Sequence, residues 1–154
     1  MSSANQTSSR RSAWPNGWAV VALAVAVALG LVGCATDDGP TPTGTWQLVE
    51  GVGPEGEVPL VDGYPVTLEV NGEEWRGTAA CNTYGATVET RGDEVEITEL
   101  FATEMACPEE GVMASEAAYL AALRDVDELE VDDRNLHLRG SASDLTFIRT
   151  ETSA

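Results

Sequence analysis

The sequence contains no lysine, and its 8 arginines stand against 26 aspartates and glutamates, so the formal net charge is −18. A chain with this charge repels the phosphates of nucleic acids and the anionic headgroups of lipids. We therefore expect no nucleic-acid partner. Electrostatic attraction is also not expected to hold the protein to a membrane.

Histidine is nearly absent as well, because His137 is the only one in the sequence. This scarcity removes most mechanisms that use an imidazole and excludes histidine-rich metal sites. The carboxylates are so numerous that no pair singles itself out as an acid–base dyad, and most are expected on solvated strand faces. Asp132, Asp133 and Asn135 lack the spacing and the terminal glutamate of a calcium loop. The sequence thus predicts no enzyme, no metal site and no cofactor.

One long apolar run stands near the N-terminus, from Ala19 to Leu29, after a polar stretch whose charges are Arg10 and Arg11. Eleven apolar residues are few for a bilayer span of about 20 residues and are typical of a secretory signal. The segment ends in Leu31-Val32-Gly33-Cys34, which resembles the lipobox before the modified cysteine of bacterial lipoproteins. We expect a lipoprotein signal peptide over residues 1–33 and lipidation of Cys34.

Two alternatives stay open for this region. The uncharged stretch from Ser12 to Thr36 could instead be an uncleaved membrane helix with an incidental cysteine. Ser9-Arg10-Arg11 also hints at twin-arginine export rather than the Sec route, although Ala13 stands where a large apolar residue is expected.

Cleavage before Cys34 would leave 121 of the 154 residues and would remove two arginines, so the net charge would become −20. Attachment then depends on acyl chains, of which two or more give stable anchoring. Residues 34–43 comprise the lipidated cysteine and a polar, flexible tether with two prolines. The sequence predicts a lipid-anchored protein of the cell membrane, exposed outside the cytoplasm.

From Gly44 onward apolar residues mostly alternate with polar ones, which is the period of strands with one wet face. The turn-rich segment Asp132–Asn135 has the length of a hairpin connection. The segment Gly51–Gly63 is rich in glycine and proline and is expected to be a loop. Trp75, between Glu74 and Arg76, is expected at an edge. The residues expected to face inward are Trp46, Leu48, Val66, Leu68, Val70, Val95, Ile97, Leu129, Val131, Leu136, Leu138, Leu145 and Phe147.

The period changes to that of a helix between about Pro108 and Arg124, where alanine is abundant. Pro108 suits the first helical position, although Gly111 could delay the start to nearer Ser115. The expected apolar stripe consists of Met113, Ala117, Leu120 and Leu123. About eight strands and one helix predict a mainly β fold, a small curved antiparallel sheet or barrel with the helix packed on its open side.

Three stretches form a recognisable pattern: Gly44–Leu48, Ala80–Gly85, and Ala102–Pro108 followed by Glu116, Tyr119 and Leu123. Together they resemble the META domain, the family of the heat-shock protein HslJ, over residues 44–150. The family often has glycines or an aromatic residue where this chain has Ala80, Ala86 and Val88, and arginine where it has Glu104. The resemblance implies a lipocalin-like curved sheet of eight strands with one helix, no established enzymatic activity and a place in the bacterial envelope.

Cys81 and Cys107 are the cysteines that remain beside Cys34, and an exported domain meets an oxidising compartment. At positions that match the family's pair, we expect them to form a disulfide, worth about 3.5 kcal/mol in the chain-entropy model. Two buried thiols are the alternative. A catalytic thiol would need a base, and His137 is expected on a polar strand face.

Five further residues of the motifs are candidate site residues: Asn82, Gly85, Thr103, Met105 and Pro108. Asn82 and Thr103 stand beside apolar strand ends and are expected to satisfy backbone groups there, with ligand binding as the alternative. Gly85, like Gly77, is expected to permit strand curvature or a positive φ.

These observations favour a non-catalytic envelope lipoprotein that contributes to envelope integrity or stress tolerance through contacts with a protein of the envelope. The alternative is a carrier or sensor that binds a small apolar ligand in the concave face of the sheet. A hydrolase is a third hypothesis, and it lacks a nucleophile–base pair. We expect side chains to fill the interior of so small a domain, which favours the first hypothesis.

Overall fold

The computed structural model describes residues 41–132 and 134–150. The expected signal peptide, Cys34 and the first part of the tether lie outside these residues. Within the described residues the chain forms nine strands and one helix: β1 (Gly44–Gly53), β2 (Gly56–Glu57), β3 (Thr67–Asn71), β4 (Glu74–Ala79), β5 (Asn82–Arg91), β6 (Glu94–Ala102), α1 (Val112–Arg124), β7 (Val126–Val131), β8 (Asn135–Gly140) and β9 (Asp144–Arg149).

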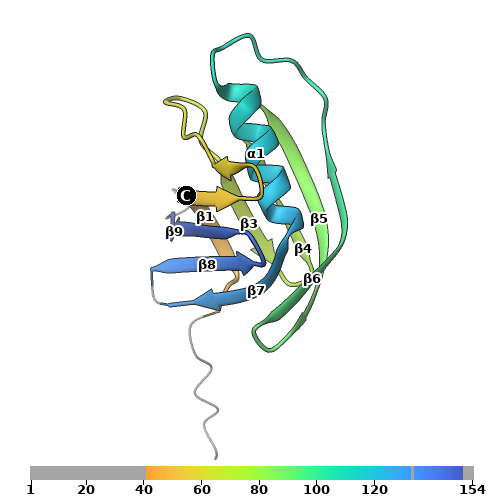
Figure 1. Cartoon of the computed structure of the whole chain (residues 1–154). Helices are drawn as coiled ribbons and strands as arrows, with labels where there is room; N and C mark the ends of the chain where they lie inside the picture. The colour runs from red at the N-terminus through yellow and green to blue at the C-terminus, as the bar shows by residue number, and fades with distance from the viewer. Residues whose placement is uncertain (1–40, 133, 151–154) are drawn as a thin grey trace, which may run out of the picture. The chain divides into compact units, whose positions relative to one another are not determined.

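The strands form one antiparallel sheet that closes on itself. Their order is β2-β1-β3-β4-β5-β6-β7-β8-β9, and β1 also pairs with β9. Eight strands therefore make a closed barrel, and the short β2 adds a hairpin to the end of β1. The expected fold, a small mainly β barrel with one helix, is confirmed (Figure 1).

The alternation of apolar residues gives the inner face of the barrel. Among its largest side chains, Trp46, Trp75 and Phe147 are at most 1% exposed. The hairpin around residue 133 has the expected facing pairs, since Leu129 lies opposite Leu138 and Val131 lies opposite Leu136.

Trp75 is not at an edge, and that expectation was wrong. It lies in β4 between β3 and β5, opposite Val70 and Ala86. Its charged neighbours Glu74 and Arg76 point outward because adjacent strand residues face opposite sides of a sheet. The flanking charges therefore marked the outer face of a central strand.

The segment Gly51–Gly63 was expected to be a loop, but it contains the end of β1 and all of β2. Here β1 pairs with β9, as Gly51 does with Leu145. A Cβ atom on Gly51 would come within 2.8 Å of Leu145, and one on Gly53 within 2.6 Å of Ala122. These glycines are strand residues that let β9 and α1 approach closely.

The helix begins at Val112, so Gly111, with a φ of 83°, delays the start past Pro108 as anticipated, although not as far as Ser115. This left-handed conformation is readily available to glycine and ends the preceding loop. Pro108 therefore lies in the loop. In its first turn, Val112 is fully buried.

The buried side of α1 also differs from the expected stripe. Leu120 and Leu123 are buried as expected, whereas Met113 is 40% exposed and Ala117 is exposed too. The inward-facing residues of the helix are Val112, Ser115, Glu116, Ala118, Tyr119, Leu120, Ala122 and Leu123. A helix that starts at Val112 turns this face, which includes a glutamate, toward the barrel.

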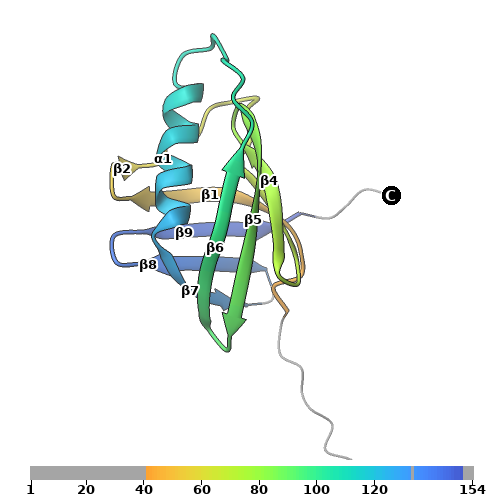
Figure 2. The same ribbon diagram turned by 90° about the vertical axis from the view of Figure 1, so that its right-hand side faces the viewer.

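The helix packs mainly on β1 and β4, whereas the barrel is weakly paired between β6 and β7. Strands β6 and β7 share a single residue pair, Glu94 with Glu128. Figure 2 shows α1 in front of β1 and β9. Tyr119 reaches inward from the helix, and its ring makes edge contacts with Tyr84 at 5.5 Å and with Phe147 at 6.4 Å between centroids. The interior is therefore filled by the helix and the inner strand residues.

Truncation of Leu120 tests this docking. We expect Leu120→Ala to lower the free energy of unfolding by about 2 to 5 kcal/mol, as for well-buried leucines. The matched control Leu60→Ala truncates a leucine that is 52% exposed and should change it by less than about 0.5 kcal/mol. Urea melts of both variants measure the difference, and equal losses would mean that this face of α1 is not docked.

Candidate functional site

Asn82, at the start of β5, is the centre of a hydrogen-bond network that joins three parts of the fold. Its Oδ1 accepts the hydroxyl of Thr103 and the backbone N–H of Met105, both at 2.8 Å. Its Nδ2 donates to the carbonyl of Met105 at 3.0 Å and to Glu116 at 3.1 Å. The side chain is fully buried, and all four of its hydrogen-bonding positions are used.

Glu116 projects from α1 toward the same point and is only 8% exposed. Its carboxylate accepts the backbone N–H of Asn82 at 2.8 Å and the Nδ2 amide at 3.1 Å. A buried carboxylate is costly unless such donors meet it. The sequence includes Glu116 in the family pattern, but its role was missed, although its spacing from Val112 and Tyr119 places it on the buried helix face.

A disulfide joins Cys81 to Cys107, with the Cα atoms 6.0 Å apart. It links the residue before Asn82 to the loop between β6 and α1. The backbone N–H of Cys107 also donates to the sulfur of Met113 at 3.5 Å. The loop is thus fixed through Met105, Cys107 and the start of the helix. Asn82, Thr103, Met105 and Glu116, together with the disulfide, hold this end of the barrel together, and we call this group the clamp.

Ala80 lies in the turn before the disulfide and has a φ of 59°. This left-handed conformation is strained for a residue with a Cβ atom. It occupies the position where the resemblance places a frequent glycine. The chain therefore adopts this turn with a residue less favourable than glycine.

Two buried tyrosines continue the contact between β5 and α1. The hydroxyl of Tyr84 donates to the carbonyl of Thr67 at 3.0 Å and lies 2.6 Å from the hydroxyl of Tyr119. Because Tyr84 has a single hydroxyl proton, Tyr119 is the donor between the two. Burial raises the pKa of both tyrosines well above 10. Both hydroxyl groups therefore stay protonated at neutral pH, and the two side chains pack α1 against β5.

Gly85 and Pro108 lie outside the network of Asn82. A Cβ atom on Gly85 would come within 2.5 Å of the ring of Phe101, so the glycine makes room for this ring. A Cβ atom on Gly77 would collide with the carbonyl of Thr67. Neither glycine has a positive φ, so close approach explains both.

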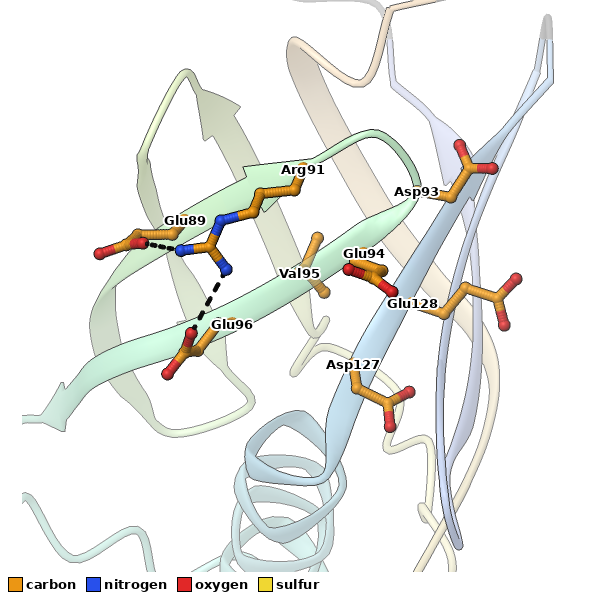
Figure 3. Close-up of a pocket in the computed structure, with 8 residues that line it drawn as sticks. All are labelled: Glu89, Arg91, Asp93, Glu94, Val95, Glu96, Asp127 and Glu128. Atoms are coloured by element: carbon orange, nitrogen blue, oxygen red, sulfur yellow. Dashed lines mark hydrogen bonds and ion pairs between the residues drawn. The ribbon is translucent and has the colours of Figure 1, made fainter.

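An acidic pocket of about 560 Å³ lies where β5, β6 and β7 meet. Figure 3 shows Arg91 turned toward Glu89 and Glu96, with N···O distances of 2.7 and 3.8 Å. The remaining carboxylates of the pocket belong to Asp93, Glu94, Asp127 and Glu128. Nowhere in residues 41–132 and 134–150 do three or more histidine, cysteine or carboxylate side chains converge as metal ligands.

In the turn between β7 and β8, the exposed carboxylate of Asp132 accepts several hydrogen bonds. Asp132 accepts the side-chain amide of Asn135 and the backbone N–H groups of Arg134 and Asn135. These hydrogen bonds lower its pKa to about 2. His137, on the next strand, is half-buried beside the hydroxyl of Thr146, at 3.3 Å.

None of the helical segments within the described residues has the length and apolarity needed to span a bilayer.

Comparison with known proteins gives a family model and several solved structures. The model of the META domain matches residues 40–152. An NMR structure of a protein from Burkholderia xenovorans is similar with a TM-score of 0.59 and 28% identity, covering 71% of this chain and 83% of that one. No curated protein matches the sequence.

A crystal structure of a DUF4847 family protein from Bacteroides vulgatus ATCC 8482 is also similar. It has a TM-score of 0.51 and 15% identity, and the match covers 72% of this chain and 95% of that one. At this identity the likeness shows the fold alone.

Replacing Asn82 by aspartate tests the clamp. Asn82→Asp exchanges the donor to Glu116 for an acceptor, so two carboxyl groups face each other inside the protein. We expect a loss of about 3 to 5 kcal/mol at pH 8. In the folded variant the two facing carboxyl groups would still share a proton at pH values above about 4, where the carboxyl groups of the unfolded chain have lost theirs. The folded variant then binds more protons than the unfolded chain, so its stability falls as the pH rises.

The measurement is urea unfolding at pH 5 and pH 8. The matched control is Asn135→Asp, which places a carboxylate beside Asp132 at an exposed turn, where water screens the repulsion, and should lower the stability far less than Asn82→Asp. Wild-type-like stability of Asn82→Asp at pH 8 would contradict the clamp.

Proposed function

The chain belongs to the META domain family, and on this premise we propose that it is a non-catalytic lipoprotein of the bacterial cell envelope. It is anchored through acyl chains on Cys34 and contributes to envelope integrity or stress tolerance, as the likeness to HslJ suggests. It acts through contacts with other envelope proteins.

The observation that carries this proposal is the filled interior. Trp46, Trp75, Tyr119 and Phe147 come from different elements and are at most 1% exposed inside the barrel. A domain whose concave side is packed in this way presents its outer face to partners. Apolar side chains on that face include Val49, Val52, Leu60 and Ile148, which are 39 to 52% exposed.

The entry of the chain into the barrel supports a short connection to the membrane. Arg149 donates to the carbonyls of Thr41 and Thr43, and its guanidinium lies 4.1 Å from the ring centroid of Trp46. Trp46 in turn donates its Nε1–H to the carbonyl of Pro42 at 2.8 Å. With residues 41–43 held in this way, six residues separate Cys34 from the anchored segment, and six residues span at most about 19 Å at about 3.1 Å per residue.

The lack of catalysis is supported by the state of the candidate nucleophiles. Cys81 and Cys107 are bonded to each other, so neither supplies a thiolate. Among the other polar groups, Asn82 and Glu116 are engaged in holding the loop and the helix together.

Labelled palmitate tests the anchor. We expect incorporation into the wild-type protein and none into Cys34→Ala, which should accumulate as an unprocessed precursor because the modified thiol is missing. Cys81→Ala with Cys107→Ala is the control and should still be labelled. Label in Cys34→Ala would refute the lipobox interpretation.

Native mass spectrometry of the protein extracted from membranes tests how it acts. We expect a complex with a second protein and no small apolar ligand in the barrel, because the inner residues already fill it. A stoichiometric lipid beyond the anchor would instead favour the carrier function in the concave face.

A further inference from the structure

The outer face of the barrel carries a row of side chains that crosses five neighbouring strands. The strand registers place Thr45 beside Glu69, Glu69 beside Arg76, Arg76 beside Gly85, and Gly85 beside Phe101. A second row of hydroxyl groups runs next to it and consists of Thr67, Thr78 and Thr83. These residues line an open pocket of about 510 Å³, which we call the threonine platform.

Phe101 is an unusual residue for such a surface. It is 69% exposed, the highest value among the large apolar side chains that the structure describes. Its ring lies against Gly85. Because Gly85 has no side chain, the surface between Phe101 and Arg76 is lower at this position. An exposed aromatic ring on an otherwise polar strand face offers a flat apolar surface on which a ligand can stack.

The charge of the platform differs from that of the acidic pockets. Its one carboxylate, on Glu69, is bonded to its one guanidinium, on Arg76, at 2.8 and 3.1 Å. The pocket along β1 and β9 has Glu50, Glu57 and Asp144 without a cation in its lining. A cation would be drawn to the acidic pockets, and an anion would be repelled by the net charge of the chain. An uncharged ligand fits the platform best.

The hydroxyl groups and the ion pair offer both donors and acceptors. The Oγ1 of Thr67 accepts the backbone N–H of Thr78 at 3.0 Å, which leaves the hydroxyl proton of Thr67 free to donate. Thr83 is exposed beside it. Arg76 and Glu69 are 60% and 43% exposed and add planar donor and acceptor groups at the rim.

We propose that the threonine platform binds a neutral glycan chain, with one sugar ring stacked on Phe101 and its hydroxyl groups bonded to Thr83, Arg76 and Glu69. A pyranose presents an apolar face and a rim of hydroxyls, which matches an aromatic ring beside polar groups. An open groove across several strands admits a chain rather than a single enclosed molecule. This inference goes beyond the proposed protein contacts and is independent of the anchor on Cys34.

The test uses the full chain in a detergent without a sugar headgroup and chitotetraose as the neutral probe. Calorimetric titration should show saturable binding with a dissociation constant between about 10 µM and 1 mM. The affinity should change less than twofold between 50 and 300 mM salt, because no charge is neutralised. Amide shifts on binding should cluster on the outer face of β3, β4, β5 and β6.

Phe101→Ala should weaken binding at least tenfold, and Phe101→Tyr should retain it. Thr83→Val, of equal size, should weaken it several-fold, which keeps the test valid if Phe101→Ala disturbs Gly85. Leu60→Ala is the matched control, since Leu60 is 52% exposed outside the platform, and it should bind like the wild type.

Tetrameric chitosan, with the same backbone but free amines, separates stacking from ion pairing. It should bind with a strong salt dependence, unaffected by Phe101→Ala, at the acidic pockets. The proposal is overturned if chitotetraose does not saturate the protein at 10 mM, if Leu60→Ala and Phe101→Ala weaken binding equally, or if the shifts lie elsewhere.

Discussion

The buried carboxylate of Glu116 is the group on which the arrangement of helix, loop and barrel depends. It needs donors inside the protein, and Asn82 supplies them from its backbone and its side chain. Asn82 in turn takes its remaining partners from Thr103 and Met105. Loss of any one member leaves other polar groups unpaired in a dry environment. The disulfide of Cys81 and Cys107 lies directly beside this network and ties down the same loop.

The position of the helix determines which side chains fill the interior of the barrel. Because α1 is held at Glu116, Tyr119 reaches the centre of the barrel, where it meets Tyr84 and Phe147. Large side chains from the helix and the strands are thus packed together inside the closed barrel. The function that we propose accordingly uses the outer face and the N-terminal anchor.

The outer face is not uniform in charge. The pockets along β6 and β7 and along β1 and β9 are lined by carboxylates, and these keep anionic surfaces away from the domain. The threonine platform has balanced charge and an exposed aromatic ring. This contrast gives a chain with so few cations one surface on which an uncharged partner can lie.

The local sequence pattern was enough to predict the strands whose alternation is regular, because neighbouring residues of a strand face opposite sides of the sheet. The three motifs were enough to identify the family. The alternation predicted the buried Trp46 and Leu48 and the hairpin that pairs Leu129 with Leu138. The exact start of α1 depended on the backbone conformation of Gly111. Glu116 is buried although its side chain is charged, so its polarity gave no sign of its position. Only closure of the barrel brings Asn82 to Glu116 across 34 positions, since preferences that act over a few residues carry no information about partners so distant. The row from Thr45 to Phe101 likewise exists only through the registers of five strands.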